Sequence, residues 1–181
     1  MTTHVQAKAA NSTSRDSADG RGVVFIHACP KAVSPHLEWA ISGVFGTNVR
    51  LDWTEQPVAP GTVRAEILWQ GPIGMGAQLA SALLAFQQVR YEVTEDASAR
   101  RPGERFAATP SLGLFRADIG EHGDVMVAEE RLRTALVQSA VTGEGLAEEI
   151  ARLIGEPWDD ELEPFRCAHE GSTVRLLHDV I

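Results

Sequence analysis

The order of apolar segments within residues 22–95 constrains the fold more than any other feature of the chain. Segments with the two-residue period of strands and segments with the spacing of helices follow one another as strand, helix, strand, strand, helix, strand. This βαββαβ order is typical of the split βαβ arrangement. It predicts an α+β fold with a ferredoxin-like core over residues 22–95.

Four segments have the pattern of strands. Residues 23–27 are apolar at four consecutive positions, which is typical of a strand in the middle of a sheet, covered on both faces. Residues 49–53, 63–69 and 89–93 alternate instead, and their apolar positions, including Trp53 and Trp69, are expected to face the helices.

Charged side chains occupy the other face of these alternating strands. They are Arg50, Asp52, Arg64, Glu66, Arg90 and Glu92. Two interpretations remain open. The face is a solvated ladder of opposite charges, or it is a docking face for another chain.

Two helices are expected between the strands. The first begins at Ser34-Pro35 and ends before Gly46, because proline suits the first helical turn and glycine suits the position after the last. The second follows the glycine-rich turn 71–76. Its expected buried positions are Met75, Leu79, Leu83 and Phe86.

The rest of the chain divides into a tail and an extension. Residues 1–21 are rich in small polar residues without periodicity, which predicts a disordered tail. Residues 96–181 predict a C-terminal extension packed on the core within a single globular domain. It is expected to hold strands at 105–108, 112–117 and 125–127, helices at 128–140 and 146–154, and a weak strand at 173–177.

The composition limits the classes of partner. A formal net charge of -9 argues against nucleic acid and anionic membranes, because both require a basic surface. The two cysteines, Cys29 and Cys167, form no disulfide framework, and no apolar run approaches the length of a membrane span. We therefore expect a cytoplasmic protein.

Three residues near the end of the first strand could carry chemistry. His27, Cys29 and His36 are the types found in nucleophile–base pairs and in metal sites. Their spacing matches no common zinc pattern, and a structural role is the alternative. We predict neither catalytic residues nor a metal site from them, and we keep His27 and His36 as candidate ligand contacts.

The turn 71–76 follows a strand and precedes a helix, so its free amides could bind a phosphate. Gly71, Gly74 and Gly76 are the candidate residues. The turn lacks the Lys and Ser/Thr of a P-loop, and a purely structural turn is the alternative.

Residues 158–165 combine acids with two aromatic side chains. Trp158 and Phe165 could hold this segment against its own domain, or together with Asp160 they could contact a partner protein. Divalent metal binding is the least favoured of the three interpretations, because the regular ligand spacing of a calcium loop is missing.

These observations favour a non-enzymatic protein-binding or regulatory module that requires no cofactor. Its expected partner is another protein or a second copy of the chain. The alternative is a sensor or enzyme that binds a phosphate-bearing metabolite at the turn 71–76.

Several segments also resemble a known family. They are His27-Ala28-Cys29-Pro30, Pro35-His36-Leu37-Glu38-Trp39-Ala40, Leu51-Asp52-Trp53 and Pro157-Trp158-Asp159-Asp160-Glu161-Leu162-Glu163-Pro164-Phe165-Arg166. Over residues 21–181 the chain resembles the actinobacterial proteins grouped as domain of unknown function family 3145. The resemblance implies an actinobacterial, cytoplasmic protein with a role near fatty-acid synthesis, and it implies no catalytic residues.

Overall fold

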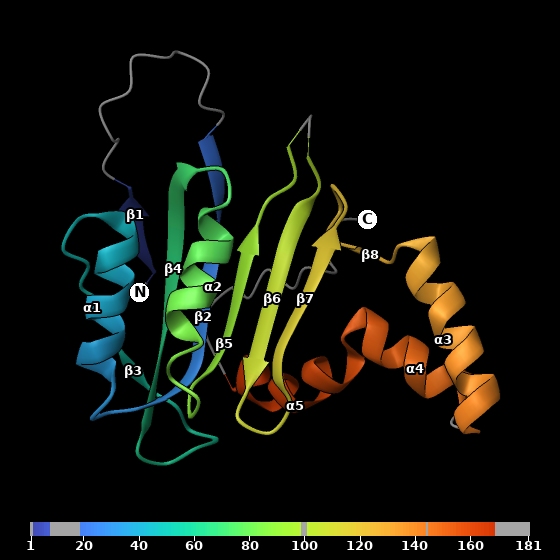
Figure 1. The fold of residues 1–181 in the computed structure, drawn as a ribbon. Coiled ribbons are helices and arrows are strands. Elements are labelled where there is room, and N and C mark those ends of the chain that lie inside the picture. The colour runs from blue at the N-terminus through green and yellow to red at the C-terminus, as the bar shows by residue number, and fades with distance from the viewer. Residues whose placement is uncertain (1, 8–18, 99–100, 144, 169–181) are drawn as a thin grey trace.

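The computed structural model of the chain describes residues 2–7, 19–98, 101–143 and 145–168. Within them it is an α+β protein with one eight-stranded mixed sheet and five helices (Figure 1). The strands are β1 (Thr3–Gln6), β2 (Asp19–Pro30), β3 (Thr54–Glu55), β4 (Thr62–Pro72), β5 (Arg90–Glu95), β6 (Gly103–Thr109), β7 (Gly113–Ile119) and β8 (Val125–Met126). The helices are α1 (Ser34–Phe45), α2 (Met75–Leu83), α3 (Glu129–Thr142), α4 (Leu146–Ile154) and α5 (Glu156–Cys167).

The strand order is β1-β4-β2-β5-β6-β7-β8, and β3 pairs with β4 beside β1. β2 lies in the interior of the sheet, between β4 and β5, as its continuous apolar run predicts. Helices α1 and α2 cover one face, and α5 lies against the other (Figure 1). The predicted extension therefore does not form a separate layer, because β6 and β7 continue the same sheet.

The main hydrophobic core lies between the sheet and the helices α1 and α2. The alternation predicted for residues 63–69 is confirmed, since Val63, Ala65, Ile67 and Trp69 are all buried there. Gly46 ends α1 in the left-handed conformation, with φ of 65°, which glycine adopts at little cost.

The predicted disordered tail is wrong for its two described parts. Residues 3–6 form β1, which pairs in parallel with Ile67–Gln70 of β4, and β2 begins at Asp19 rather than at residue 23. β1 has only four residues and too few apolar positions to show a pattern in the sequence. Backbone pairing with the edge of β4 holds it in place instead. Residues 8–18 lie outside the described residues.

The strand predicted at 49–53 is also wrong, although Val49 and Leu51 are buried as expected. The segment forms no ladder, and only Thr54–Glu55 pairs with β4. Side chains take over its backbone hydrogen bonds: the amide of Val49 donates to Ser42 Oγ at 2.9 Å, and that of Leu51 to Glu38 Oε1 at 2.9 Å. The alternation of apolar residues thus identified the buried face correctly but could not show which segment pairs with the edge of β4.

The segment 156–167, for which the sequence predicted neither a helix nor a strand, is the helix α5. Pro157 lies in its first turn, where its missing N–H costs nothing, and Pro164 lies inside it. The strands and helices predicted between residues 105 and 154 are confirmed. The strand predicted at 173–177 lies outside the described residues.

α5 covers one part of the charged face of the strands, so the solvated interpretation does not hold there. Glu92, expected to face outward, is only 5% exposed, because α5 covers this part of the sheet. No helix among the described residues has the length and apolar character needed to cross a membrane.

Trp69 provides a test of the register of β4. It is 3% exposed, so replacement by alanine should lower the free energy of unfolding by about 3–5 kcal/mol. Trp39, which is 79% exposed, is the matched control, and Trp39→Ala should change that free energy by less than about 0.5 kcal/mol. Urea denaturation followed by circular dichroism measures both, and equal effects would contradict the register.

Candidate functional site

A cluster of charged side chains lies between the sheet and α5. At its centre, Glu92 of β5 accepts hydrogen bonds from Arg105 of β6 (Nη2–Oε1, 2.8 Å) and from Arg166 of α5 (Nη2–Oε1, 2.6 Å; Nε–Oε2, 3.0 Å). His27 of β2 places its Nε2 2.7 Å from Glu92 Oε2. Because an ionised carboxylate can only accept, this nitrogen carries the hydrogen. One carboxylate thus joins three elements that are distant in sequence.

Asp159 completes the cluster from α5. Its carboxylate accepts hydrogen bonds from Arg166 (Nη2–Oδ1, 2.8 Å) and from Arg105 (Nη1–Oδ2, 3.2 Å). Two carboxylates therefore alternate with two guanidinium groups. Removal of one member of such a buried set leaves an uncompensated charge and costs far more than the net stabilisation that the set provides.

The cluster favours the charged forms of Glu92 and Arg105. Burial alone would raise the pKa of Glu92, but the hydrogen bonds and charges of His27 and Arg166 outweigh it and hold that pKa well below its ordinary value. Burial likewise opposes the charge on Arg105, but Asp159 and Glu92 raise its pKa above the ordinary value. The arrangement thus favours a fixed negative charge on Glu92 beside a fixed positive charge on Arg105.

A second polar contact lies farther along α5. Glu161 accepts hydrogen bonds from Thr109 Oγ1 at 2.9 Å and Arg90 Nη2 at 3.1 Å, and it contacts the hydroxyl of Ser111. Burial would raise the pKa of Glu161, but the hydroxyl donors and Arg90 lower it overall. The guanidinium of Arg90 also lies over the ring of Phe165, 4.9 Å from its centre.

Apolar contacts fix α5 as well. Leu162 is fully buried in a small core that includes Phe115 and Ala117 of β7. The ring of Trp158 lies 5.1 Å from that of Phe115, and its Nε1 donates to the carbonyl of Gly113 at 3.0 Å. α5 is therefore held against the sheet along its whole length.

The three candidate partner contacts of this segment differ in their surroundings. Trp158 and Phe165 contact the chain's own sheet, whereas Asp160 is exposed. A role for them in partner binding stays a prediction, and the described contacts favour the alternative in which this segment holds to its own domain.

His27, Cys29 and His36 do not come together. A β-bulge after Ile26 places His27 on the α5 side and Cys29 in the core beneath the helices α1 and α2. His36 is exposed on α1. Burial raises the pKa of the Cys29 thiol to about 12, which disfavours the nucleophilic thiolate at neutral pH. Across the described part of the chain, no three or more His, Cys, Asp or Glu side chains are grouped to hold a metal ion.

The turn 71–76 binds an anion from within the chain. The amide of Gly74 donates to Glu95 Oε1 at 2.8 Å, and the amide of Gly76 donates to Oε2 at 2.9 Å. Glu95 is 4% exposed, and its carboxylate lies at the N-terminus of α2, where the helix dipole favours negative charge. The amides that could hold a phosphate at Gly74 and Gly76 thus already have a ligand.

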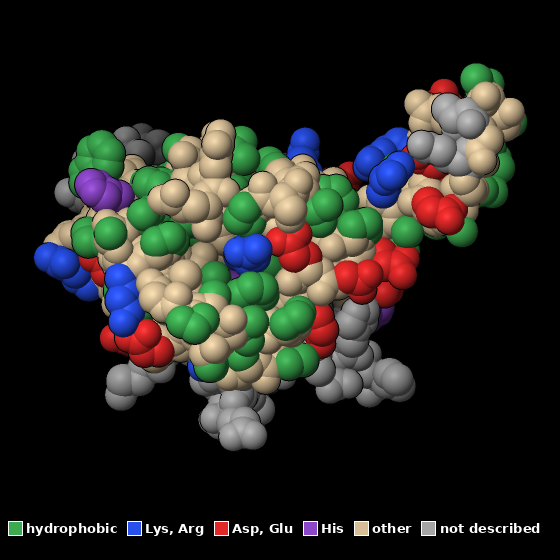
Figure 2. Space-filling view, turned by 90° about the horizontal axis from the view of Figure 1, so that it is seen from below, with side chains coloured by type: hydrophobic (Ala, Val, Ile, Leu, Met, Phe, Trp, Pro, Cys, Tyr) green, Lys and Arg blue, Asp and Glu red, His purple; other side chains and the backbone are tan. Residues whose placement is uncertain are grey.

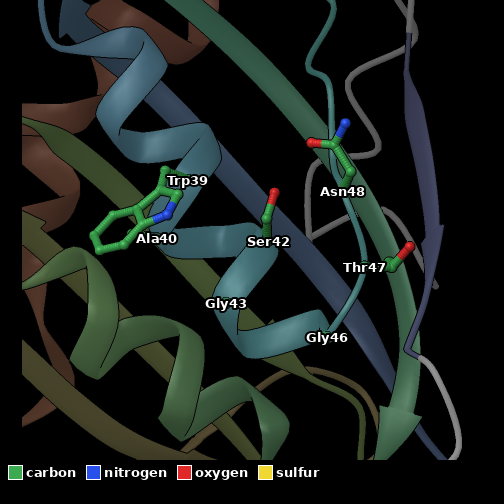
Figure 3. Close-up of a pocket in the computed structure, with 7 residues that line it drawn as sticks. All are labelled: Trp39, Ala40, Ser42, Gly43, Gly46, Thr47 and Asn48. Carbon is green, nitrogen blue, oxygen red and sulfur yellow. The ribbon is translucent and has the colours of Figure 1, made fainter.

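A shallow groove runs beside the C-terminal half of α1 (Figure 3). It encloses about 510 Å³, and Trp39, Ser42, Thr47 and Asn48 are among the residues that line it. Trp39 lies apart from Thr47 and Asn48, and none of the lining residues is charged (Figure 3). Ser42 Oγ already accepts the amide of Val49. The groove therefore gathers no set of groups that could bind a charged ligand or carry out a reaction.

The helices α3 and α4 form an arm that stands away from the body of the protein (Figures 1 and 2). Its residues are mostly exposed: among the residues of α3 whose burial is described, Ala135 alone is buried, and in α4 no residue is. Several large apolar side chains of the arm are therefore exposed to water. They are Leu132 (37% exposed), Leu136 (54%), Val137 (64%), Val141 (80%), Ile150 (38%) and Ile154 (39%). Six of the twelve exposed large apolar side chains among the described residues lie on this arm.

The sequence contained partial signals for these features. Glu92 lies between the apolar residues Tyr91 and Val93, and Arg105 directly precedes the apolar run Phe106-Ala107-Ala108, but this pattern alone does not show that either charge is buried. Asp159 and Arg166 are seven residues apart, a spacing that places both on one face of a helix once the helix is recognised. For the arm, the stripe of Leu132 and Leu136 was visible in the sequence, but the sequence could not show that these side chains stay partly exposed in the described structure.

Residues 23–179 match the family described as protein of unknown function, DUF3145. The chain belongs to this family. No curated protein and no solved structure matches the chain. The family match thus confirms the resemblance noted in the sequence and brings no activity or ligand with it.

Glu92→Gln tests the charge cluster, because it keeps the shape of the side chain and removes its charge. The free energy of unfolding near neutral pH should fall by about 3–5 kcal/mol, since Arg105 and Arg166 lose their buried counter-ion. Because folding lowers the pKa of Glu92, its contribution is present above the unfolded pKa and is lost as pH falls through the folded pKa. The difference between wild type and Glu92→Gln should therefore narrow in acid.

Urea denaturation over a series of pH values measures this difference. The control is Glu55→Gln, since the Glu55 side chain is 70% exposed and its pairing with Lys31 lies at the surface. A constant difference between wild type and Glu92→Gln at every pH would contradict a lowered pKa for Glu92.

Glu95→Ala tests the occupied turn. It leaves the amides of Gly74 and Gly76 without their acceptor, so the free energy of unfolding should fall by about 1–3 kcal/mol. Calorimetric titration of the wild type with inorganic phosphate or coenzyme A should show no binding heat. Binding by the wild type that Gly76→Ala abolishes would instead establish the metabolite site.

Proposed function

We propose that this protein is a non-enzymatic protein-binding module and that the α3–α4 arm is its binding surface. The observation that carries this proposal is the exposure of large apolar side chains on a structure that projects from the body. Val141 and Val137 of α3 are 80% and 64% exposed. Exposed apolar surface of this kind on a soluble protein is typical of a surface that another protein covers.

The physical state of the arm supports this proposal. Helices shorter than about 12–15 residues are marginal in water on their own, and they are usually stabilised by packing of an apolar face. α3 has 14 residues and α4 has nine, and of their side chains with described burial Ala135 alone is buried. A partner that covers the apolar side chains would supply the packing that these helices lack.

The other candidate regions support a binding role rather than catalysis. The buried charges of Glu92, Arg105 and Arg166 pair with one another and hold α5 in place, and Glu95 fills the glycine turn. Each of these groups has a structural task with a defined partner. A non-enzymatic module needs no more than a stable body that presents the arm.

Three finer assignments belong to the same proposal. We assign residues 22–95 to a ferredoxin-like core, because β5, β2, β4 and β3 follow one another in the sheet in the order of a split βαβ unit. We assign the protein to the cytoplasm, because both described cysteines are free. A regulatory role near fatty-acid synthesis rests on the family resemblance alone.

Leu136→Glu tests the binding surface. Leu136 is 54% exposed, so a charge there should leave the fold intact but disfavour an apolar contact. Tagged wild type and variant, expressed in the native cells, are compared by affinity purification and mass spectrometry. Proteins enriched with the wild type should be lost with the variant.

The matched control is Leu84→Glu, since Leu84 at the end of α2 is 47% exposed but lies outside the arm. It should retain the enriched proteins. The same set of proteins with wild type, Leu136→Glu and Leu84→Glu would show that the arm binds none of them.

A further inference from the structure

The face of the sheet on which α5 lies carries apolar side chains that the described helices do not pack against. Phe25 of β2 is the ladder neighbour of Glu92, and Val23 of β2 lies opposite Leu68 of β4. Since alternate residues of a strand share one face, these three apolar residues face the same side as Glu92. They are only partly buried, and neither hydrophobic cluster of the described residues includes them.

α5 leaves this surface open because it lies across the lower end of the strands (Figure 1). Its hydrogen bonds reach Glu92, the hydroxyl of Thr109 and the carbonyl of Gly113. Val23 lies farther from α5 along β2. A sheet with apolar side chains on a face is normally covered there by a second layer. Within the described part of the chain, that layer is therefore incomplete on this face.

The chain that follows α5 starts beside the open surface. Arg166, in the last turn of α5, donates to Glu92 (Nη2–Oε1, 2.6 Å), whose neighbour on β2 is Phe25. Residues 169–181 come next and lie outside the described residues. At about 3.3 Å per extended residue, about five of them are enough to cross four strands spaced about 4.8 Å apart. This segment therefore has the length to cover the surface.

The sequence of the segment also suits an apolar surface. Val174 and Leu176 flank Arg175, so in an extended segment the two apolar side chains share one side and the arginine takes the other. The family match extends to residue 179, so most of the segment belongs to the part of the chain that the family shares. Its other large apolar residues are Leu177, Val180 and Ile181.

Attachment to α5 favours this segment over a separate partner. A tethered segment has an effective concentration in about the millimolar range, which a free protein of similar intrinsic affinity does not reach in a cell. The open surface and the start of the segment are adjacent, so no long linker lowers that concentration.

We propose that residues 169–181 form an extended strap that packs beside α5 and covers Val23, Phe25 and Leu68. The strap adds apolar contacts next to the last turn of α5, which ion pairs of Arg166 hold to the sheet. This surface is separate from the α3–α4 arm, so the proposed function does not depend on it.

Thiol labelling of the full-length protein tests the strap. Val23→Cys is introduced together with Cys167→Ala, which removes the exposed native thiol, whereas Cys29 is buried. Adding Leu176→Asp and Leu177→Asp should speed the reaction of the introduced thiol with a maleimide at least about tenfold, because burying a carboxylate against an apolar surface is unfavourable. Circular dichroism checks that each variant is folded.

Two controls separate uncovering of the face from a general effect. Arg175→Asp should change the labelling rate less than about twofold, because Arg175 lies on the other side of an extended segment. Trp39→Cys, on the 79% exposed position of α1, should react at the same rate with and without the two leucine substitutions.

Crosslinking gives a second test that adds no charge. Val23→Cys and Leu176→Cys, with Cys167→Ala, should be joined within one chain by a short bismaleimide, whereas Trp39→Cys and Leu176→Cys should not. Labelling of Val23→Cys that ignores the leucine substitutions, or a failure of the first pair to crosslink, would overturn the strap. So would a labelling rate that falls as protein concentration rises, since a second copy would then cover the face.

Discussion

The position of α5 depends on one buried carboxylate. Glu92 accepts hydrogen bonds from β6 and α5 and lies within hydrogen-bonding distance of His27 on β2, so it links the middle of the sheet to the helix that covers it. Charged groups are rarely buried without strong compensation, and here Arg105 and Arg166 supply it. An apolar contact at this place would tolerate small shifts of α5. A set of alternating charges does not, because each shift leaves a charge without its partner.

The direction of the arm follows from this fixed helix. α4 and α5 meet at Gly155, whose φ of 90° is a conformation that other residues rarely adopt. A Cβ atom at Gly155 would lie 2.7 Å from the ring of Phe115. The backbone at this position is therefore closer to β7 than a residue with a side chain would permit. With α5 anchored to the sheet beyond this point, α4 leaves the body at the turn, and the arm extends away from the sheet (Figure 1). The charge cluster therefore determines where the proposed binding surface lies, although it contacts none of it.

The periodic spacing of apolar residues predicted part of this fold, whereas the features that depend on which strands pair could not be predicted. The buried face of β4 and the helices α1 to α4 followed from apolar spacing. β1 and the unpaired segment 49–53 did not, because the edge of β4 can accept either chain and only the three-dimensional structure shows which one occupies it. Glu92 was placed on the correct face of its strand, but alternation cannot show whether that face is covered. The helix α5, which covers this face, was not predicted, because its segment contains two prolines and many acidic residues.

The acidic residues of this protein fall into two groups, which differ in burial. Glu92 and Glu95 are buried and act as internal ligands, one for guanidinium groups and the other for the amides of a glycine turn. The exposed acids give the chain its net negative charge, which keeps copies apart over most of the surface. The α3–α4 arm differs from this surface, because its exposed side chains include Leu136, Val137 and Val141. The acidic surface therefore contributes to the specificity of the proposed binding surface, because it disfavours acidic partners, whereas the apolar side chains of the arm favour a partner that covers them.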